Sequence, residues 1–126
     1  MAQKVLVVGA SLKAERYSNI AINMLLDFGH EVKALGRREG EIREVSIQKE
    51  KWAYTDIDTV TMYLSPVNQE EYKAYIINLN PKRVIFNPGT ENPEFARELE
   101  KSGIQTEQAC TLVLLRTNQF DEIQLV

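Results

Sequence analysis

Residues 4–11 read Lys-Val-Leu-Val-Val-Gly-Ala-Ser, and residues 12–19 continue with Leu-Lys-Ala-Glu-Arg-Tyr-Ser-Asn. The first half is a short apolar run bounded by glycine, which predicts a central parallel strand buried on both faces. The second half is polar and leads into apolar residues at helical spacing, so a helix is expected to begin near Ser18. A strand, a glycine turn and a helix start in this order are typical of the first phosphate-binding turn of an α/β sheet.

The residue types in this turn suit an anion. Gly9 lets a ligand approach the backbone, Arg16 offers a two-pronged donor, and Ser11, Ser18 and Asn19 add hydroxyl and amide groups near the helix dipole. The turn has no second or third glycine at the dinucleotide-binding spacing. The alternative is structural, with Gly9 forming a tight turn and Ser18 capping a helix.

Length and composition indicate an ordinary globular protein. The 126 residues fit one domain, 1–126, and 44% are hydrophobic while 26% are charged. No apolar run reaches the roughly 20 residues that span a bilayer, and the first residues lack the pattern of an export signal. We therefore expect a cytoplasmic protein that does not associate with membranes.

Charge and metal-ligand content exclude other classes of function. The net charge of −3 provides no general attraction to nucleic acid. One cysteine, Cys110, excludes an internal disulfide, and one histidine, His30, leaves no cluster for a zinc site. His30 is expected at the surface, at the start of a strand.

Alternating strand and helix patterns fill most of the chain. Residues 37–58 are expected to form an extended excursion with room for one edge strand, at the short alternating piece 44–47. Trp52 is expected to pack this loop onto the core; the alternative is that it stacks on a ligand base. The last residues, 121–126, are expected to be a free tail or to pack on a partner. The patterns predict strands at 5–8, 31–35, 59–64, 83–86 and 104–106, and helices at 18–29, 68–80, 92–103 and 109–115.

These elements predict an α/β protein, a single Rossmann-like domain with a mostly parallel five-stranded sheet and helices on both faces. Ligands of such sheets bind outside the carboxyl ends of the strands, beside the first strand. The segments expected there are the Gly9 loop, 35–37, 65–66 and 87–90. They contain no triad and no pair of carboxylate and histidine, so this rim is interpreted as holding a ligand rather than transforming it.

The order of these motifs resembles the small stand-alone CoA-binding proteins, which are related to the CoA-binding domain of the succinyl-CoA synthetase alpha subunit. The resemblance extends from Lys4 to about Phe120. Its marks are Val-Val-Gly-Ala-Ser at 7–11, Arg16 followed by Ser18, Arg37 after the second strand, Pro66 after the third, Gly89 followed by Asn92, and Cys110. The chain departs from the usual pattern at Ala14 and at Leu35-Gly36.

The resemblance implies that CoA or an acyl-CoA lies across the strand ends as the cofactor. The loops at Arg37 and Ser65-Pro66 would flank its adenosine part, and Arg37 or Lys13 would face the 3′-phosphate. The loop with Asn87 and Gly89 also lies at this rim. The pyrophosphate would lie near Gly9, Ala10, Ser11, Arg16, Ser18 and Asn19.

The sequence leaves three functions open. The first is a CoA-binding module without catalysis, in which Cys110 is either an inert thiol or a partner for a mixed disulfide with CoA. The second is an NAD(P)-type nucleotide-binding enzyme or a ligase fragment; Leu35-Gly36-Arg37 after the second strand lacks the acidic residue expected for NAD. The third is a protein-interaction module that keeps the fold without the ligand. Both a monomer and a homodimer fit the sequence.

Overall fold

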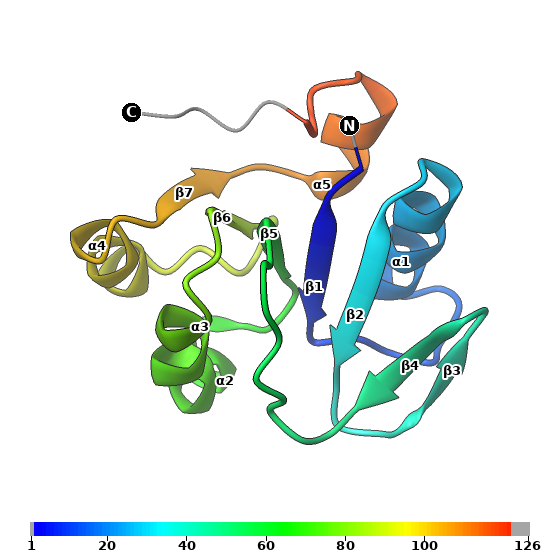
Figure 1. Ribbon diagram of the computed structural model, residues 1–126, viewed down its shortest axis with the longest axis horizontal. Coiled ribbons are helices and arrows are strands. Elements are labelled where there is room, and N and C mark those ends of the chain that lie inside the picture. Colours follow the sequence, from blue (N-terminus) through cyan, green and yellow to red (C-terminus); the bar gives the residue numbers. More distant parts are fainter. Residues whose placement is uncertain (1, 122–126) are drawn as a thin grey trace.

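The computed structural model describes residues 2–121, which form an α/β fold around one seven-stranded sheet (Figure 1). The predicted α/β class is confirmed, whereas five strands was too few. The strands are β1 Lys4–Val8, β2 Glu31–Leu35, β3 Gly40–Ile42, β4 Val45–Gln48, β5 Thr59–Met62, β6 Arg83–Phe86 and β7 Gln105–Gln108. The helices are α1 Tyr17–Asp27, α2 Pro66–Gln69, the 3₁₀ turn η1 Glu70–Tyr72, α3 Lys73–Leu79, α4 Pro93–Lys101 and α5 Thr111–Arg116.

The two additional strands come from the excursion after β2, where the sequence predicts room for one edge strand. β3 and β4 form an antiparallel hairpin whose turn places Arg43 in the left-handed region, at φ 54°. β4 pairs in parallel with β2, so β3 rather than β4 is the edge strand. Pieces of three and four residues with mixed charge carry too little periodicity for the sequence to reveal the hairpin.

An irregular segment, residues 49–58, connects β4 to β5 in place of a crossover helix. Trp52 remains 52% exposed, and its backbone oxygen accepts a hydrogen bond of 2.6 Å from the Tyr75 hydroxyl. The expectation that the Trp52 ring packs this segment onto the core is therefore wrong. Ile57 and Tyr54 pack the segment onto the core instead, and the Trp52 backbone joins it to α3.

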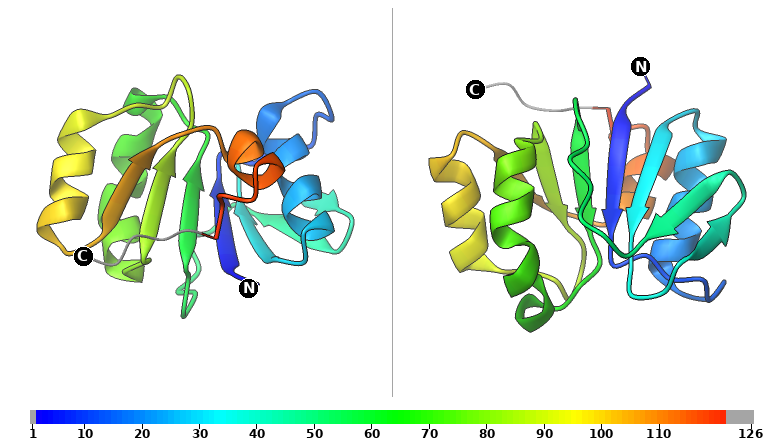
Figure 2. Two further views of the ribbon diagram at one scale, coloured as in Figure 1. Left: turned by 90° about the horizontal axis from the view of Figure 1, so that it is seen from above. Right: turned by 60° about the horizontal axis from the view of Figure 1, so that its bottom comes forward.

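The strand order, β3-β4-β2-β1-β5-β6-β7, places β1 in the middle of the sheet. The chain passes from β1 to β2 on one side and later to β5 on the other, so the loops after β1 and β5 diverge. α1 and α5 cover one face, while α3 and α4 cover the other (Figure 2). This divergence creates a crevice at the carboxyl ends of β1 and β5, the usual ligand position in open α/β sheets.

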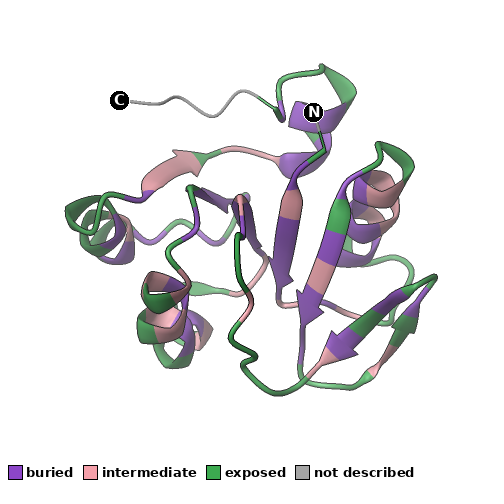
Figure 3. Cartoon of the chain, viewed as in Figure 1, coloured by how far each residue is buried: buried purple, intermediate pink, exposed green. Residues whose placement is uncertain are grey.

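Two hydrophobic cores lie on the two faces, and β1 contributes to both. Val5 and Val7 pack with α1 and α5, whereas Leu6 and Val8 pack with α3 and α4. All four side chains are fully buried, as predicted for a central strand (Figure 3). The sheet therefore holds the carboxyl end of β1 rigidly below the crevice.

The helix after β5 begins earlier than the sequence predicts. Ser65 is the N-cap and Pro66 the first helical residue, where proline loses no hydrogen bond because that N–H would be unpaired in any helix. Asn68 therefore lies inside α2 and is not a cap. The cap predicted for the next long helix is confirmed, since Asn92 Oδ1 accepts the Phe95 N–H at 3.1 Å.

A buried polar cluster lies at the amino ends of the parallel strands, opposite the crevice. His30 is only 7% exposed, so its predicted surface position is wrong. Its Nδ1 accepts the Gln3 N–H at 2.9 Å, and its ring stands 5.0 Å from that of Phe120. Beside them, the fully buried Arg83 donates to the Phe120 carbonyl at 2.7 Å. This cluster fastens the segment after α5; residues 122–126 of the predicted tail lie outside the described residues.

Candidate functional site

The loop after β1 is fixed by the neighbouring strand. The backbone N–H groups of Gly9 and Ala10 both donate to the Leu35 carbonyl, at 3.0 and 2.9 Å. Gly9 has φ +95°, and a β-carbon there would lie 3.0 Å from the backbone of Tyr63. Residue 9 therefore needs to be glycine for two reasons, its backbone conformation and its close approach to the end of β5.

The rest of this loop is held by its own hydrogen bonds. The Lys13 N–H donates to Ser11 Oγ at 3.1 Å, and the Arg16 N–H donates to the Lys13 carbonyl at 3.1 Å. The Asn19 side chain donates to the Ser11 carbonyl at 3.0 Å. Asn19 thus supports the loop from below, while Lys13 and Arg16 extend from it with exposed side chains.

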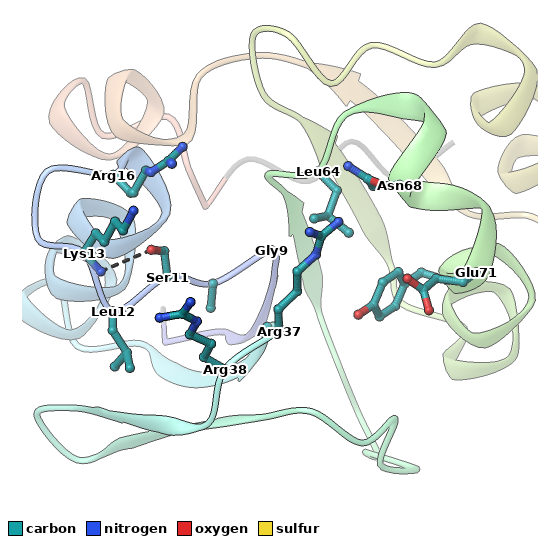
Figure 4. Close-up of a pocket in the computed structure, with 13 residues that line it drawn as sticks. Gly9, Ser11, Leu12, Lys13, Arg16, Arg37, Arg38, Leu64, Asn68 and Glu71 are labelled. Atoms are coloured by element: carbon teal, nitrogen blue, oxygen red, sulfur yellow. Dashed lines mark hydrogen bonds between the residues drawn. The ribbon is translucent and has the colours of Figure 1, made fainter.

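A cleft of about 350 Å³ opens above the carboxyl ends of β1, β2 and β5 (Figure 4). Its two sides are the loop after β1 and the segment from Leu64 through α2 and η1, and the loop after β2 lies between them. The lining residues are Gly9, Ala10, Ser11, Leu12, Lys13, Arg16, Gly36, Arg37, Arg38, Leu64, Asn68, Glu71 and Tyr72.

The cleft carries an excess of positive charge. Lys13 and Arg16 come from the loop after β1, and Arg37 and Arg38 come from the loop after β2 (Figure 4). Within residues 2–121, none of these four cations forms an ion pair with an acidic side chain. Among the described residues that line the cleft, Glu71 is the one acidic residue. Unpaired cations that converge on one cleft attract an anionic ligand.

The wall opposite the cations is built by Tyr72 and Glu71. Burial raises the pKa of the Tyr72 hydroxyl, Glu71 adds to this shift, and Arg37 opposes it. Lys51, from the irregular segment 49–58, lies 4.7 Å above the Tyr72 ring and 3.7 Å from the Glu71 carboxylate. Lys51 therefore connects the segment 49–58 to both residues of this wall.

Half of the predicted site residues meet in this cleft. The structure brings together Gly9, Ala10, Ser11, Lys13, Arg16 and Arg37. It leaves Ser18, Asn19, Ser65, Pro66, Asn87 and Gly89 outside the lining. Ser18 and Asn19 are buried in the first turn of α1, and Ser65 Oγ accepts a hydrogen bond from Asn68 at the start of α2.

Asn87 has a different task from the predicted one. Its side-chain NH₂ donates to Thr61 Oγ1 at 2.8 Å and to the Met62 carbonyl at 2.9 Å. Its oxygen accepts the Thr111 N–H at 2.8 Å. The amide is 2% exposed, and its donors and acceptor are used to join β5, β6 and α5. It has no free group to offer a ligand.

Seven lining residues were not among the predicted site residues, although one of them, Gly36, lies in the segment 35–37 that was expected at the rim. They are Leu12, Gly36, Arg38, Leu64, Asn68, Glu71 and Tyr72. Arg38 follows Arg37 directly, and this pair of basic residues was a usable signal. Asn68, Glu71 and Tyr72 were missed because the N-cap of this helix was predicted at Asn68, three residues after the observed N-cap, Ser65. The half-buried Cys110 does not line the cleft.

Within residues 2–121, no group of three or more His, Cys, Asp or Glu side chains is placed to hold a metal ion. None of the helices in this range is long and apolar enough to cross a membrane.

The strand order and the crevice beside β1 define the class of fold as Rossmann-like. The family model described as the CoA binding domain matches residues 3–116. The chain therefore belongs to the CoA binding domain family.

Solved structures with the same fold include uncharacterised proteins. One is 42% identical with a TM-score of 0.93, and the match covers 95% of this chain and 99% of that one. A hypothetical protein from Pyrococcus horikoshii OT3 is 25% identical with a TM-score of 0.83, covering 92% of this chain and 83% of that one. A conserved hypothetical protein from Pyrococcus furiosus is 27% identical with a TM-score of 0.74, covering 83% and 91%. No curated protein matches the sequence.

Proposed function

We propose that the cleft binds CoA or an acyl-CoA. The observation that carries this proposal is the arrangement of its four unpaired cations as two pairs on adjacent loops. CoA has phosphate at two separate positions, a pyrophosphate in the middle of the molecule and a phosphate on the 3′-carbon of the ribose. Membership of the CoA binding domain family supports the same ligand.

The pyrophosphate is assigned to the loop after β1. Gly9 and Ala10 bring the backbone close to the ligand there, and Lys13 and Arg16 supply positive charge. α1 begins at Tyr17, directly after Arg16, and no side chain caps its first turn. Its free N–H groups and its dipole favour an anion at this end.

The 3′-phosphate is assigned to Arg37 and Arg38. Both follow β2, where NAD-binding sheets carry an acidic residue that accepts hydrogen bonds from the ribose hydroxyls. Two guanidinium groups at this position disfavour NAD and favour a ribose that carries phosphate, because guanidinium binds phosphate oxygens in pairs. NADP, whose ribose carries a 2′-phosphate, is the second candidate on the same observation.

The cleft is proposed to hold its ligand without transforming it. Within the part of the chain that the structure describes, its lining contains neither histidine nor cysteine, and Glu71 is its one carboxylate. General acid-base or nucleophilic catalysis usually needs two such groups within hydrogen-bond reach of one another. The proposed role is therefore a binding module, expected to act as a monomer or a homodimer in the cytoplasm.

Thermal unfolding in the presence of ligands tests this proposal. At about 100 times its Kd, a ligand that binds the folded state adds about 2.7 kcal/mol of stability. We expect CoA and acetyl-CoA to raise the Tm of the wild type, and NAD and ATP to raise it much less. Arg16→Ala removes one charge-assisted contact, worth about tenfold in Kd, and should reduce the CoA effect to about half. Arg116→Ala is the matched control, because it removes an exposed arginine at the end of α5, outside the cleft lining, and should retain the effect. A larger shift with NADP than with CoA would favour the second candidate, and no shift with any nucleotide would refute the proposal.

A further inference from the structure

The β3-β4 hairpin touches the loop after β1 through one apolar contact. A β-carbon placed on Gly40 would lie 2.6 and 2.7 Å from the two methyl carbons of Leu12. The Leu12 side chain therefore rests directly on the Gly40 backbone, in the space that a side chain would occupy. Leu12 is 44% exposed and lies between Ser11 and Lys13 in an otherwise polar loop. Figure 4 shows it pointing away from Lys13 and Arg16, toward the hairpin.

This contact joins the two loops that carry the cations. Leu12 precedes Lys13, and the hydrogen bonds from Lys13 to Ser11 and from Arg16 to Lys13 transmit the position of Leu12 along the loop. On the other side, Gly40 begins β3, two residues after Arg38. A shift of the hairpin relative to Leu12 would therefore change the distance between the two cation pairs.

The hairpin has a second attachment far from the cleft. Arg43 lies in the turn of the hairpin. Its side chain donates to Asp27 Oδ1 at 2.8 Å and to the Asn23 carbonyl at 3.2 Å. This attachment holds the hairpin turn against the C-terminal half of α1. Near the cleft, β4 is held by its pairing with β2, whereas the edge strand β3 contacts the loop after β1 through Leu12 on Gly40.

We propose that the contact of Leu12 with Gly40 sets the spacing between the two cation pairs, and with it the preference for a ligand that carries phosphate at two separate positions. Leu12 and Gly40 are positioning residues in this proposal. The inference rests on the proposed function, because the ligand is taken to be CoA.

The test compares Kd values for CoA and for dephospho-CoA, which lacks the 3′-phosphate, in the wild type and in Gly40→Ala. Residue 40 does not have a positive φ, and the added methyl meets the flexible end of Leu12, so the variant should fold. We expect the wild type to prefer CoA about tenfold, the size of one charge-assisted contact, and Gly40→Ala to lose most of that preference.

A mutant cycle separates this contact from general damage. Leu12→Ala should reduce the preference for CoA as Gly40→Ala does, and the double variant should be no worse than Leu12→Ala alone, because the two residues act through one contact. Phe28→Ala removes another exposed apolar side chain, at the far end of α1, and should keep the wild-type preference. An unchanged preference in Gly40→Ala, or additive effects in the double variant, would overturn the inference.

A second measurement decides the matter if the wild type binds no CoA, the outcome in which the proposed function fails. Amide hydrogen exchange of ligand-free protein reports the order of residues 10–17 directly. We expect faster exchange in this loop in both single variants, with exchange in β1 and β5 unchanged. Equal loop exchange in the wild type and both variants would then overturn the positioning role of Leu12 and Gly40.

Discussion

Gly36 lies against the carbonyl oxygen of Ala10, so closely that a β-carbon on residue 36 would overlap that oxygen. The Gly36 N–H donates to the Gln48 carbonyl at 3.0 Å, which keeps the end of β2 from moving away. The first turn of the cleft and the loop that carries Arg37 and Arg38 therefore meet at a point with no room for a side chain.

Gly36→Ala should damage the cleft as well as the fold. The methyl group has to push back the Ala10 backbone, and with it the loop that holds Lys13 and Arg16, so CoA affinity should fall by at least about tenfold. Binding measured by calorimetry checks this result.

The control for that variant is Gly29→Ala. Gly29 has φ +87° with open space around it, far from the cleft, so alanine there should cost about 1–2 kcal/mol of stability through backbone strain alone. Binding by Gly29→Ala should match the wild type. If Gly36→Ala bound CoA as tightly as Gly29→Ala does, the close approach of Gly36 to Ala10 would have no role in the site.

Stability should fall as the pH drops below about 6.5. Burial lowers the pKa of His30 from its ordinary value of 6.5, and the opposing effect of Asp121 is smaller. Between the lowered pKa and 6.5 the unfolded chain binds more protons than the folded chain, so acid favours unfolding, by at most about 1.4 kcal/mol per pH unit. Above this window the contribution is constant.

Urea unfolding at pH 7.5, 6.5 and 5.5 measures this effect. His30→Asn is the matched variant, because an amide oxygen can accept the Gln3 N–H without titrating in this range. The variant should show a smaller loss of stability between pH 6.5 and 5.5 than the wild type does. Identical pH profiles for the two proteins would mean that His30 is not the group responsible.

Arg83 should contribute far more to stability than its neighbour Lys82. The Arg83 guanidinium is fully buried and donates to Thr59 Oγ1 at 2.9 Å, to the Phe120 carbonyl and to Glu107. Arg83→Met removes the donor of Thr59 and Glu107 and leaves the Phe120 carbonyl only its 3.3 Å hydrogen bond from the Gln3 side chain, so the free energy of unfolding should fall by about 3 kcal/mol or more. Urea denaturation measures the loss.

Lys82→Met provides the comparison. Lys82 pairs with Asp58 at 3.1 Å, but its side chain is 64% exposed, and exposed ion pairs contribute about 1 kcal/mol or less. A similar loss in the two variants would contradict the assignment of Arg83 as the centre of the buried cluster.

Local patterns predicted the central strands well. The apolar run at Val5–Val8 and the β-branched stretch that begins at Thr59 specify buried parallel strands without help from the rest of the chain. The hairpin β3-β4 was missed because its strands are short and gain their stability from pairing with β2, a contact that only the folded structure provides.

The site was predicted in part for the same reason. Gly9, Lys13 and Arg16 lie on one continuous loop, so the sequence alone could predict that they share an anion-binding site. The task of Asn87 depends on Thr111, which is 24 residues further along the chain, and the wall at Glu71 depends on where α2 begins. Such long-range relationships leave no periodic signal in the sequence.

Calorimetric titration of the wild type with CoA, repeated with the double variant Arg16→Ala/Arg37→Ala, tests the central claim most directly. The variant removes one cation from each pair and no ion pair within residues 2–121, so it should fold as the wild type does. The account predicts a Kd in the micromolar range for CoA in the wild type, on the order of −8 kcal/mol, and a loss of at least about a hundredfold in the variant. Equal affinity in the two proteins, or no heat of binding in the wild type, would contradict the assignment of the cleft as a CoA site.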